Sequence, residues 1–336
     1  MTFLILRFSS VGNVAMTVPV VASLSRRYPQ HRFVVVSKNR LSAMFYGMDN
    51  VLFHASDGME RGLIGMLRLW WHLRQYKVDA VIDLQDVLRT HILRFFYRLQ
   101  GKAIYVVQSD RWLKRRITWH GYKGEQLPSE TDRYRHTFAK AGLETDDSFT
   151  AIAVNTDAAK AVNKRFGEKK GIRIGVAPFA KHYSNMLPYR TLRQVIQQLS
   201  ALDNTSFYLF GAGEIECEML RQWSCLFPHT VSVAGELPLA EELELMRSLD
   251  LMLCMDSANQ HIASVVGLPT LTIWLATHPA LGFLGWKQQH TLQTTLPCRP
   301  CSVHGTSLCR CFNFACQQME ADTIMNKVKE ILTDNE

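Results

Sequence analysis

The chain opens with an apolar run, a break of small residues and a helical stretch, and this succession decides the fold: Phe3-Leu4-Ile5-Leu6-Arg7-Phe8, then Ser9-Ser10-Val11-Gly12-Asn13, then Val14-Ala15-Met16-Thr17-Val18-Pro19-Val20-Val21-Ala22-Ser23-Leu24. It predicts a strand, a tight loop and a helix, which is the start of a βαβ unit. Backbone N–H groups and the helix dipole attract negative charge at a helix N-terminus. Position 13, an asparagine, is therefore well placed to touch a ligand.

Strand-like and helix-like segments alternate along nearly all of the remaining sequence. Expected strands lie at residues 33–36, 51–54, 80–84, 104–107, 149–154, 172–177, 207–210, 231–233, 251–255 and 270–274. Expected helices lie at residues 63–73, 87–99, 132–141, 189–202, 214–226, 240–249, 259–266 and 321–332. The alternation forms two successive runs. They predict an α/β protein with two doubly wound parallel sheets, in domains 1–165 and 166–336. We expect ligands in the cleft between two such domains.

Bulk properties indicate a globular protein of two domains. The chain has 336 residues, of which 47% are hydrophobic and 20% charged. Its N-terminus does not resemble a signal peptide, because no basic leader precedes the apolar run and Arg7 interrupts it. Residues 257–286 carry no Lys, Arg, Asp or Glu, but their polar residues, glycines and prolines argue against a membrane span. Eight cysteines without a signal peptide favour a reducing, cytoplasmic location.

The net charge of +8 is concentrated in residues 89–123, which hold nine Lys/Arg against Asp110 alone. Trp112, Trp119 and Tyr122 are interleaved with these charges. The segment suits phosphate groups or an anionic membrane surface, and a solvated basic face explains it equally well. No nucleic-acid-binding motif accompanies these charges, so the sequence does not favour a nucleic-acid partner.

In the second domain, a buried strand ends in an acidic and several small residues before a helix: Met255-Asp256-Ser257-Ala258-Asn259-Gln260-His261. Free N–H groups at that helix start suit a diphosphate, and Asp256 suits a sugar hydroxyl. Helix capping by Asp256 or Ser257 is the alternative. A second turn, Gly211-Ala212-Gly213-Glu214, resembles a nucleotide-binding turn.

Two stretches together resemble the signatures of glycosyltransferase family 9, the lipopolysaccharide heptosyltransferase family. The first is Arg7-Phe8-Ser9-Ser10-Val11-Gly12-Asn13-Val14-Ala15-Met16-Thr17-Val18-Pro19, which is similar to R-F-S-x-x-G-D-x-x-x-T-x-P. The second is Asp256-Ser257-Ala258-Asn259-Gln260-His261-Ile262-Ala263, followed by Gly267 and Pro269, which is similar to D-S/T-G/A-x-x-H-x-A with a Gly and a Pro after it. They occur in the family's order, and the strand pattern between them also matches.

The resemblance implies a GT-B architecture with two facing Rossmann-like domains, the first for the acceptor and the second for the nucleotide-sugar. It implies ADP-heptose as donor, a phosphorylated lipopolysaccharide inner core as acceptor, and no metal for the transfer. Contact with the inner-membrane surface would follow from such an acceptor. The positions implied at the donor are Asp256, Ser257, Ala258, Asn259, His261, Glu214, Leu237 and Asn185. Those implied at the acceptor are Ser10, Gly12, Arg89 and Arg115.

This chain departs from the family pattern at two charged positions. Asn13 stands where the family has the Asp that acts as general base, and an amide cannot take a proton. Asn185, in Asn185-Met186-Leu187-Pro188, stands where the family's K-x-W-P has a lysine facing the leaving diphosphate. Lys181 is a candidate substitute for that cation. Asp83 and Asp86, after another strand, are candidate substitutes for the base, with helix capping as the alternative.

Five of the eight cysteines fall within nineteen residues, at Cys298, Cys301, Cys309, Cys311 and Cys316. A C-x2-C pair followed by further cysteines suits structural zinc, for which Cys298, Cys301, Cys309 and Cys316 are the candidate ligands. The later gaps are not those of a standard zinc finger, so a disulfide and free thiols stay open.

Three functions are therefore compared. The first is a sugar transferase that uses a nucleotide-heptose. The second is a non-catalytic paralogue that binds donor or acceptor, which the asparagines at positions 13 and 185 favour. The third is a basic nucleic-acid-binding protein with a zinc ribbon, for which the sequence offers the least support.

Overall fold

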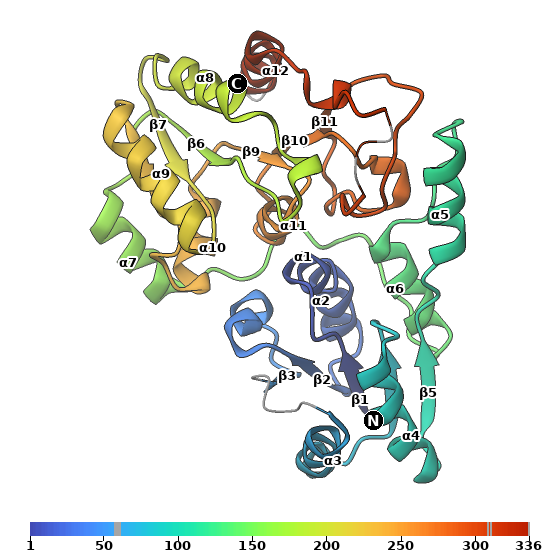
Figure 1. The fold of residues 1–336 in the computed structure, drawn as a ribbon. Coiled ribbons are helices and arrows are strands. Elements are labelled where there is room, and N and C mark those ends of the chain that lie inside the picture. Colours follow the sequence, from blue (N-terminus) through green and yellow to red (C-terminus); the bar gives the residue numbers. More distant parts are fainter. Residues whose placement is uncertain (57–61, 308, 310, 335–336) are drawn as a thin grey trace. The chain divides into compact units, whose positions relative to one another are not determined.

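The computed structural model describes residues 1–56, 62–307, 309 and 311–334. The chain divides into two compact units. The first comprises Met1–Ser109 and Pro128–Val154, and the second comprises Asp110–Leu127 and Asn155–Glu336. Each unit is built on one parallel sheet covered by helices (Figure 1).

The first unit contains a five-stranded sheet in the order β3-β2-β1-β4-β5, with every pairing parallel. Its strands are β1 (Thr2–Leu6), β2 (Arg32–Ser37), β3 (Val51–Ala55), β4 (Ala80–Asp83) and β5 (Ala103–Val106). Its helices are α1 (Val11–Ala15), α2 (Val18–Arg27), α3 (Gly62–Leu73), α4 (Leu88–Leu99) and α6 (Glu130–Ala139), with short 3-10 turns at η1 (Asn39–Phe45) and η2 (Arg74–Tyr76).

The order of these strands reverses beside β1. The chain runs from β1 outward to β3 and then returns to β4 on the other side. In such sheets ligands bind outside the carboxyl ends of the strands at this point of reversal. The loops that follow β1 and β4 are therefore the expected ligand-binding edge of this unit.

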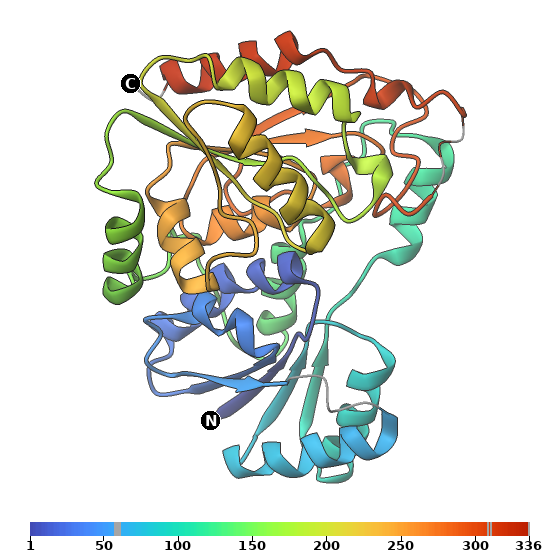
Figure 2. The same ribbon diagram turned by 60° about the vertical axis from the view of Figure 1, so that its left-hand side comes forward.

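Helices α3 and α4 lie side by side and cover one face of this sheet (Figures 1 and 2). Met66, Leu69 and Leu73 of α3 join Leu93 and Tyr97 of α4 in one core cluster with strand residues. Each set is spaced by three and four positions, so it forms one buried stripe on its helix.

The second unit contains a six-stranded sheet in the order β11-β10-β9-β6-β7-β8, again parallel throughout. Its strands are β6 (Ile172–Ala177), β7 (Thr205–Leu209), β8 (Thr230–Ser232), β9 (Leu251–Met255), β10 (Thr270–Trp274) and β11 (His290–Gln293). Its helices are α5 (Arg111–His120), α7 (Thr156–Phe166), α8 (Tyr189–Leu199), α9 (Glu214–Leu226), α10 (Leu239–Arg247), α11 (Ala258–Val265) and α12 (Ala321–Asp334), with 3-10 turns η3 (Tyr183–Asn185), η4 (Pro279–Leu281) and η5 (Ala315–Gln317).

The strand order of this sheet reverses between β6 and β9. The chain leaves β6 toward β8 and then returns to β9 on the other side. Helix α12, at the end of the chain, packs beside α8 over this sheet (Figure 2). The loops after β6 and β9 form the expected ligand-binding edge of this unit.

The structure corrects several expected elements. Residues 149–154 form no strand, although Phe149 and Ile152 are buried. The expected helix at residues 14–24 is divided into α1 and α2, because Pro19 is tolerated in the first turn of a helix but not in its interior. Strand β11 and helices α5 and α7 were not among the expected elements.

The basic segment 89–123 is shared between the two units, because residues up to Ser109 belong to the first unit and Asp110–Leu127 belong to the second. Lys114 is buried with its ammonium 4.0 Å from the centre of the Phe283 ring. This lysine therefore contributes to packing and not to a solvent-facing basic patch. Among the described residues, no helix is long and apolar enough to cross a membrane.

Candidate functional site

The second unit places its acidic candidate, Asp256, directly after β9 at the point where the strand order reverses. Ser257 follows as the N-cap of α11, and its side chain accepts a hydrogen bond from the Asn259 N–H. The predicted strand end and the predicted capping by Ser257 are thus both present. The start of α11 turns unpaired backbone N–H groups toward the same edge of the sheet.

Asp256 lies at the centre of a hydrogen-bond network. Its Oδ2 accepts from Thr277 Oγ1 at 2.6 Å and from Asn185 Nδ2 at 3.3 Å. Its Oδ1 accepts from Gln260 Nε2 at 3.0 Å. An ionised carboxylate has about four acceptor sites, so one remains for a ligand hydroxyl.

The environment of Asp256 disfavours its charged form. Burial of the carboxyl raises its pKa from 3.8 to about 6, and the hydrogen bonds from Thr277 and Gln260 oppose this increase only in part. The residue as a whole is partly exposed at this edge of the sheet.

Asn185 is held between Asp256 and a turn of the cysteine-rich segment. Its Nδ2 also donates to the His304 carbonyl at 3.4 Å, and its buried Oδ1 has no hydrogen-bond partner among the described residues. Gly305 packs against this amide so closely that a Cβ there would lie 2.6 Å from the Asn185 Oδ1. The neighbouring Ser184 Oγ donates to the Gly305 carbonyl at 2.6 Å. The space beyond the Asn185 side chain is therefore filled.

The same turn is closed by Ser302, whose Oγ accepts from the N–H groups of Gly305 at 2.9 Å and Thr306 at 3.0 Å. Arg299 fixes the segment from the other side. Its buried guanidinium donates to the carbonyls of Trp274 at 2.9 Å and Thr277 at 2.8 Å, and also to those of Leu275 and Thr294. The cysteine-rich segment is thus fastened to the loop that carries Thr277.

None of the eight cysteines, all within the described part of the chain, forms a disulfide. Burial raises the pKa of Cys316 to about 11 and also raises that of Cys298. The pKa of Cys309 is lowered, because hydrogen bonds from backbone N–H groups outweigh the effect of burial. Among the described residues no group of three or more His, Cys, Asp or Glu side chains is arranged to hold a metal ion. Structural zinc stays a prediction from the cysteine spacing alone.

The other donor-site candidates lie along the carboxyl ends of the second sheet. Lys181 is exposed four residues after β6, and Glu214 is exposed at the first position of α9, after β7. Leu237 is partly buried between β8 and α10, and His261 is buried within α11. The parallel sheet therefore brings residues that are distant in sequence to one edge. Glu216, not Glu214, closes the glycine turn by accepting from the Ala212 N–H at 3.0 Å.

In the first unit, Asn13 lies in α1, just after β1. Its Nδ2 donates to Ser10 Oγ at 3.1 Å, and Gly12 beside it is buried. Ser9 Oγ accepts from Arg89 Nη2 at 3.0 Å and from Gln85 Nε2 at 3.2 Å. The loops after β1 and β4 thus join at the point of reversal and bring Arg89 near the serines and Asn13. Arg115, the other acceptor candidate, is exposed on α5 of the second unit.

Asp83 and Asp86 are both engaged in the structure. Asp83 is fully buried, with Oδ2 3.2 Å from Arg94 Nη1, and its Oδ1 accepts from the N–H groups of Gln85 and Asp86. Asp86 Oδ1 lies 2.9 Å from His91 Nε2 and 3.3 Å from Arg94 Nη2. These contacts fit a role in shaping the β4 loop. Helix capping, the alternative predicted from the sequence, is not what these acids do, because Val87 is the N-cap of α4.

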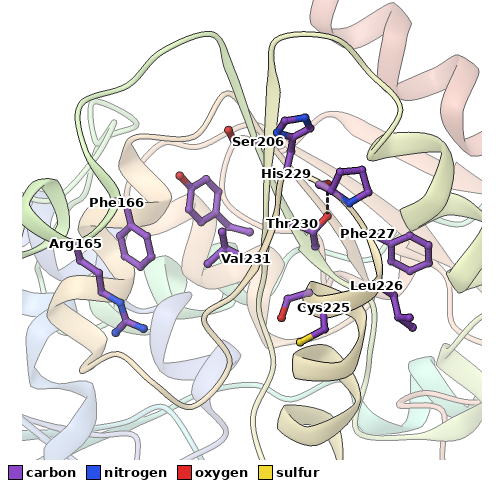
Figure 3. Close-up of a pocket in the computed structure, with 12 residues that line it drawn as sticks. Arg165, Phe166, Ser206, Cys225, Leu226, Phe227, His229, Thr230 and Val231 are labelled. Carbon is purple, nitrogen blue, oxygen red and sulfur yellow. Dashed lines mark hydrogen bonds between the residues drawn. The ribbon is translucent and has the colours of Figure 1, made fainter.

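A hollow of about 810 Å³ lies beside the edge strand β8 (Figure 3). It is lined by residues such as Phe166, Tyr208 and Phe227. Asp256 and its partners are not among its lining residues. The hollow also lies away from the strand ends at which the strand order of the sheet reverses. We assign no function to it.

Several residues of the site were not identified from the sequence. Thr277, Gln260 and Gly305 surround Asp256 and Asn185, and Gln85 joins the first unit's loops. Of these residues, only Gln260 could have been identified from the sequence. It lies in the first turn of α11, four positions after Asp256, a spacing at which side chains at a helix start can meet. The others are brought in from distant loops.

Two units, each built on a parallel sheet with polar residues at its point of reversal, have the architecture of the GT-B fold. The model of the family described as glycosyltransferase family 9 (heptosyltransferase) matches residues 66–310. The chain therefore belongs to glycosyltransferase family 9.

Named relatives agree with this family. The chain is 22% identical over 281 residues to the lipopolysaccharide core heptosyltransferase OpsX of Haemophilus influenzae, covering 82% of this chain and 79% of the relative. It is similar in fold to E. coli ADP-heptose LPS heptosyltransferase II, with a TM-score of 0.73, 15% identity and coverage of 100% and 99% of the two chains. E. coli heptosyltransferase WaaC with ADP-2-deoxy-2-fluoro heptose has a TM-score of 0.66 at 16% identity, with both chains covered completely.

The raised pKa of Asp256 predicts that the free energy of unfolding declines as the pH rises from 4 to 7. The variant Asp256→Asn should reduce this decline. The folded protein holds this proton up to about pH 6, whereas an unfolded chain releases it near pH 4. The group therefore stabilises the fold below about pH 4, and this contribution, at most about 3 kcal/mol, is lost as the pH rises to about 6. Denaturant unfolding from pH 4 to 7 should show a decline in the parent that is smaller in Asp256→Asn.

Asp157→Asn is the matched control, since that side chain is 92% exposed in the same unit. Its pH profile should follow the parent. A parent profile that Asp256→Asn leaves unchanged would contradict the burial of this carboxyl.

Gly305→Ala should destabilise the second unit through contact with Asn185. Gly305 has φ +83° and no room for a Cβ, whereas Gly167 has φ +72° and nothing within 4 Å of the added atom. The left-handed backbone costs about 1–2 kcal/mol in both Ala variants, and the overlap should add about 1–3 kcal/mol at Gly305 alone. The free energy of unfolding measures both.

A double-mutant cycle isolates the overlap, because the atoms nearest to the added Cβ all belong to the Asn185 side chain. In an Asn185→Ala background, Gly305→Ala should cost only as much as Gly167→Ala. An undiminished cost would refute the contact.

Proposed function

We propose that this chain transfers a heptose from ADP-heptose to a phosphorylated lipopolysaccharide inner-core acceptor. The observation that carries the proposal is Asp256, with a free acceptor site, at the start of α11 and at the point of reversal of the second sheet. Membership of glycosyltransferase family 9 supports the reaction class. The names of the relatives, which include ADP-heptose and the lipopolysaccharide core, support the donor and the acceptor.

The proposed donor site is the edge of the second sheet. The unpaired N–H groups at the start of α11 would bind the diphosphate, and Asp256 would accept from a sugar hydroxyl. Lys181 would add a cation near the phosphates, and Glu214 and Leu237 would contact the nucleoside. The N–H groups and Lys181 would stabilise the charge that develops on the leaving diphosphate.

The proposed reaction is a direct displacement. An acceptor hydroxyl oxygen forms a bond to the anomeric carbon, the bond from that carbon to the diphosphate oxygen breaks, and its electron pair leaves with ADP. The hydroxyl proton must also be released. Asn13 cannot accept it, so the proton passes to water and the reaction relies on positioning and on stabilisation of the leaving group.

A donor-binding protein without transferase activity is the second candidate. Two observations favour it: the amide at Asn13, and the Asn185 side chain enclosed between Asp256 and Gly305. The latter leaves no cation at the position where the family resemblance places a lysine. This candidate shares the donor site and lacks the chemical step.

Donor binding followed by turnover tests both candidates. We expect ADP-heptose and ADP to bind in calorimetry, and Asp256→Ala to weaken ADP-heptose about tenfold, as the loss of one hydrogen bond to a charged group predicts. Asp157→Ala, at an exposed position of the same unit, is the control. Absence of binding to both ligands would refute the proposal. Donor binding without transfer to an inner-core acceptor would select the second candidate.

Asn13→Asp should increase turnover. A carboxylate at this position would accept the acceptor proton, and Ser10 Oγ, 3.1 Å from the present amide nitrogen, would donate to it. A general base contributes about 10²–10⁴-fold, so an increase of at least about tenfold is expected, with a new ionisation in the pH profile of kcat.

Asn13→Ala is its control, because it removes the amide without supplying a base, and it should bring no increase. If Asn13→Asp is no faster than an active parent, position 13 does not govern proton removal in this chain.

A further inference from the structure

Helices α3 and α4 of the first unit carry large apolar side chains on their outer faces as well as toward the sheet. On α3, Ile64, Leu67 and Trp71 are exposed, while Met66, Leu69 and Leu73 are buried. Each set is spaced by three or four residues, so the two sets form separate stripes about half a turn apart. A helix that only covers a sheet has no need of the second stripe.

Helix α4 repeats this arrangement. Thr90, Leu93 and Tyr97 are buried, and Leu88, Phe95 and Leu99 are exposed on the opposite side. Helices α3 and α4 pack side by side on one face of the sheet (Figures 1 and 2). Their buried stripes pack with strand residues, so both outer stripes are turned away from that sheet. The six exposed side chains form what we term the outer stripe pair. Exposed apolar surface of this extent on adjacent helices marks an interaction site.

The charge on the described residues around the outer stripe pair is positive. Neither helix contains an aspartate or glutamate, and Arg68 of α3 and Arg98 of α4 are exposed beside the apolar side chains. From residue 62 to 106 the sequence has seven Lys/Arg, at 68, 74, 77, 89, 94, 98 and 102, against three acids. Of these acids, Asp83 is buried and Asp86 is paired with Arg94. The third, Asp79, accepts from the backbone N–H of Thr2.

We propose that the outer stripe pair of α3 and α4 docks the protein on an anionic lipid bilayer. Apolar side chains flanked by arginines, with a tryptophan among them, are the chemistry of helices that lie in the interface of a membrane. The arginines attract anionic headgroups, and the apolar side chains enter the boundary with the acyl chains. A second copy of the chain fits less well, because it would bring two positive surfaces together.

The inference adds to the proposed function a surface that would hold the protein where a lipid-borne acceptor lies. Its test measures vesicle binding and needs neither donor nor acceptor. Failure of the docking surface and failure of the proposed transfer are therefore separate results.

The experiment is sedimentation of the full chain with vesicles of phosphatidylethanolamine and phosphatidylglycerol, compared with vesicles of phosphatidylcholine alone. We expect binding to the anionic vesicles that weakens as the salt concentration rises. Ile64→Ser with Trp71→Ser should reduce the partition coefficient at least about tenfold, because two large apolar side chains no longer leave water. Leu88→Ser with Phe95→Ser should do the same from α4. Arg68→Glu with Arg98→Glu should abolish the preference for anionic lipid.

Ile215→Ser is the matched control, because Ile215 of α9 and Ile64 of α3 are both 78% exposed. It should bind as the parent does, and unchanged circular dichroism and thermal unfolding confirm that the paired variants fold. The proposal is overturned if the parent binds neither vesicle or both equally, or if both paired serine variants bind like the parent. It is also overturned if light scattering shows a parent dimer that the serine pairs convert to monomer, since the surface would then serve a second copy.

Discussion

The buried guanidinium of Arg299 is the constraint on which the second unit's site depends. It donates to backbone carbonyls at the end of β10 and in the loop beyond, including those of Trp274 and Thr277. A parallel strand that ends inside a protein leaves carbonyls that must find donors. Arg299 supplies several at once and so holds Thr277 where its hydroxyl reaches Asp256. The arginine lies between Cys298 and Cys301, so its hydrogen bonds join the cysteine-rich segment to the site.

In the first unit, an acid shapes the loop after β4. Asp83 ends β4, accepts from the next two backbone N–H groups that face it, and pairs with Arg94. The resulting turn directs Gln85 to the Phe8 N–H and Arg89 to Ser9. In both units a buried charged side chain shapes a loop that contributes to the site, and other side chains are left to meet a ligand. Removal of one partner from such a pair leaves an uncompensated buried charge, which makes these residues structurally demanding.

The two asparagines have different surroundings. Asn13 is partly exposed and bonded only locally to Ser10, so the space around it is compatible with a carboxylate. Asn185 is buried between Asp256 and Gly305, where a lysine would have to displace the 302–307 turn or pair with Asp256. The 302–307 turn packs on the Asn185 side chain, and burial keeps the pKa of the neighbouring Asp256 raised.

The sequence by itself determined the two parallel sheets, the strand ends at Asp83 and Asp256 and the start of α11, because these depend on local hydrophobic periodicity and capping. It also identified the family through two short stretches. It did not show that the first helix is divided into α1 and α2 just before Pro19. Nor did it show the edge strand β11 or the packing of residues 110–127 with the second sheet. Only the tertiary structure decided that Thr277, Arg299 and Gly305 surround Asp256 and Asn185, because those contacts join loops far apart in the chain. It also decided which apolar stripe of α3 and α4 is buried, since both stripes have helical spacing and only packing on the sheet distinguishes them.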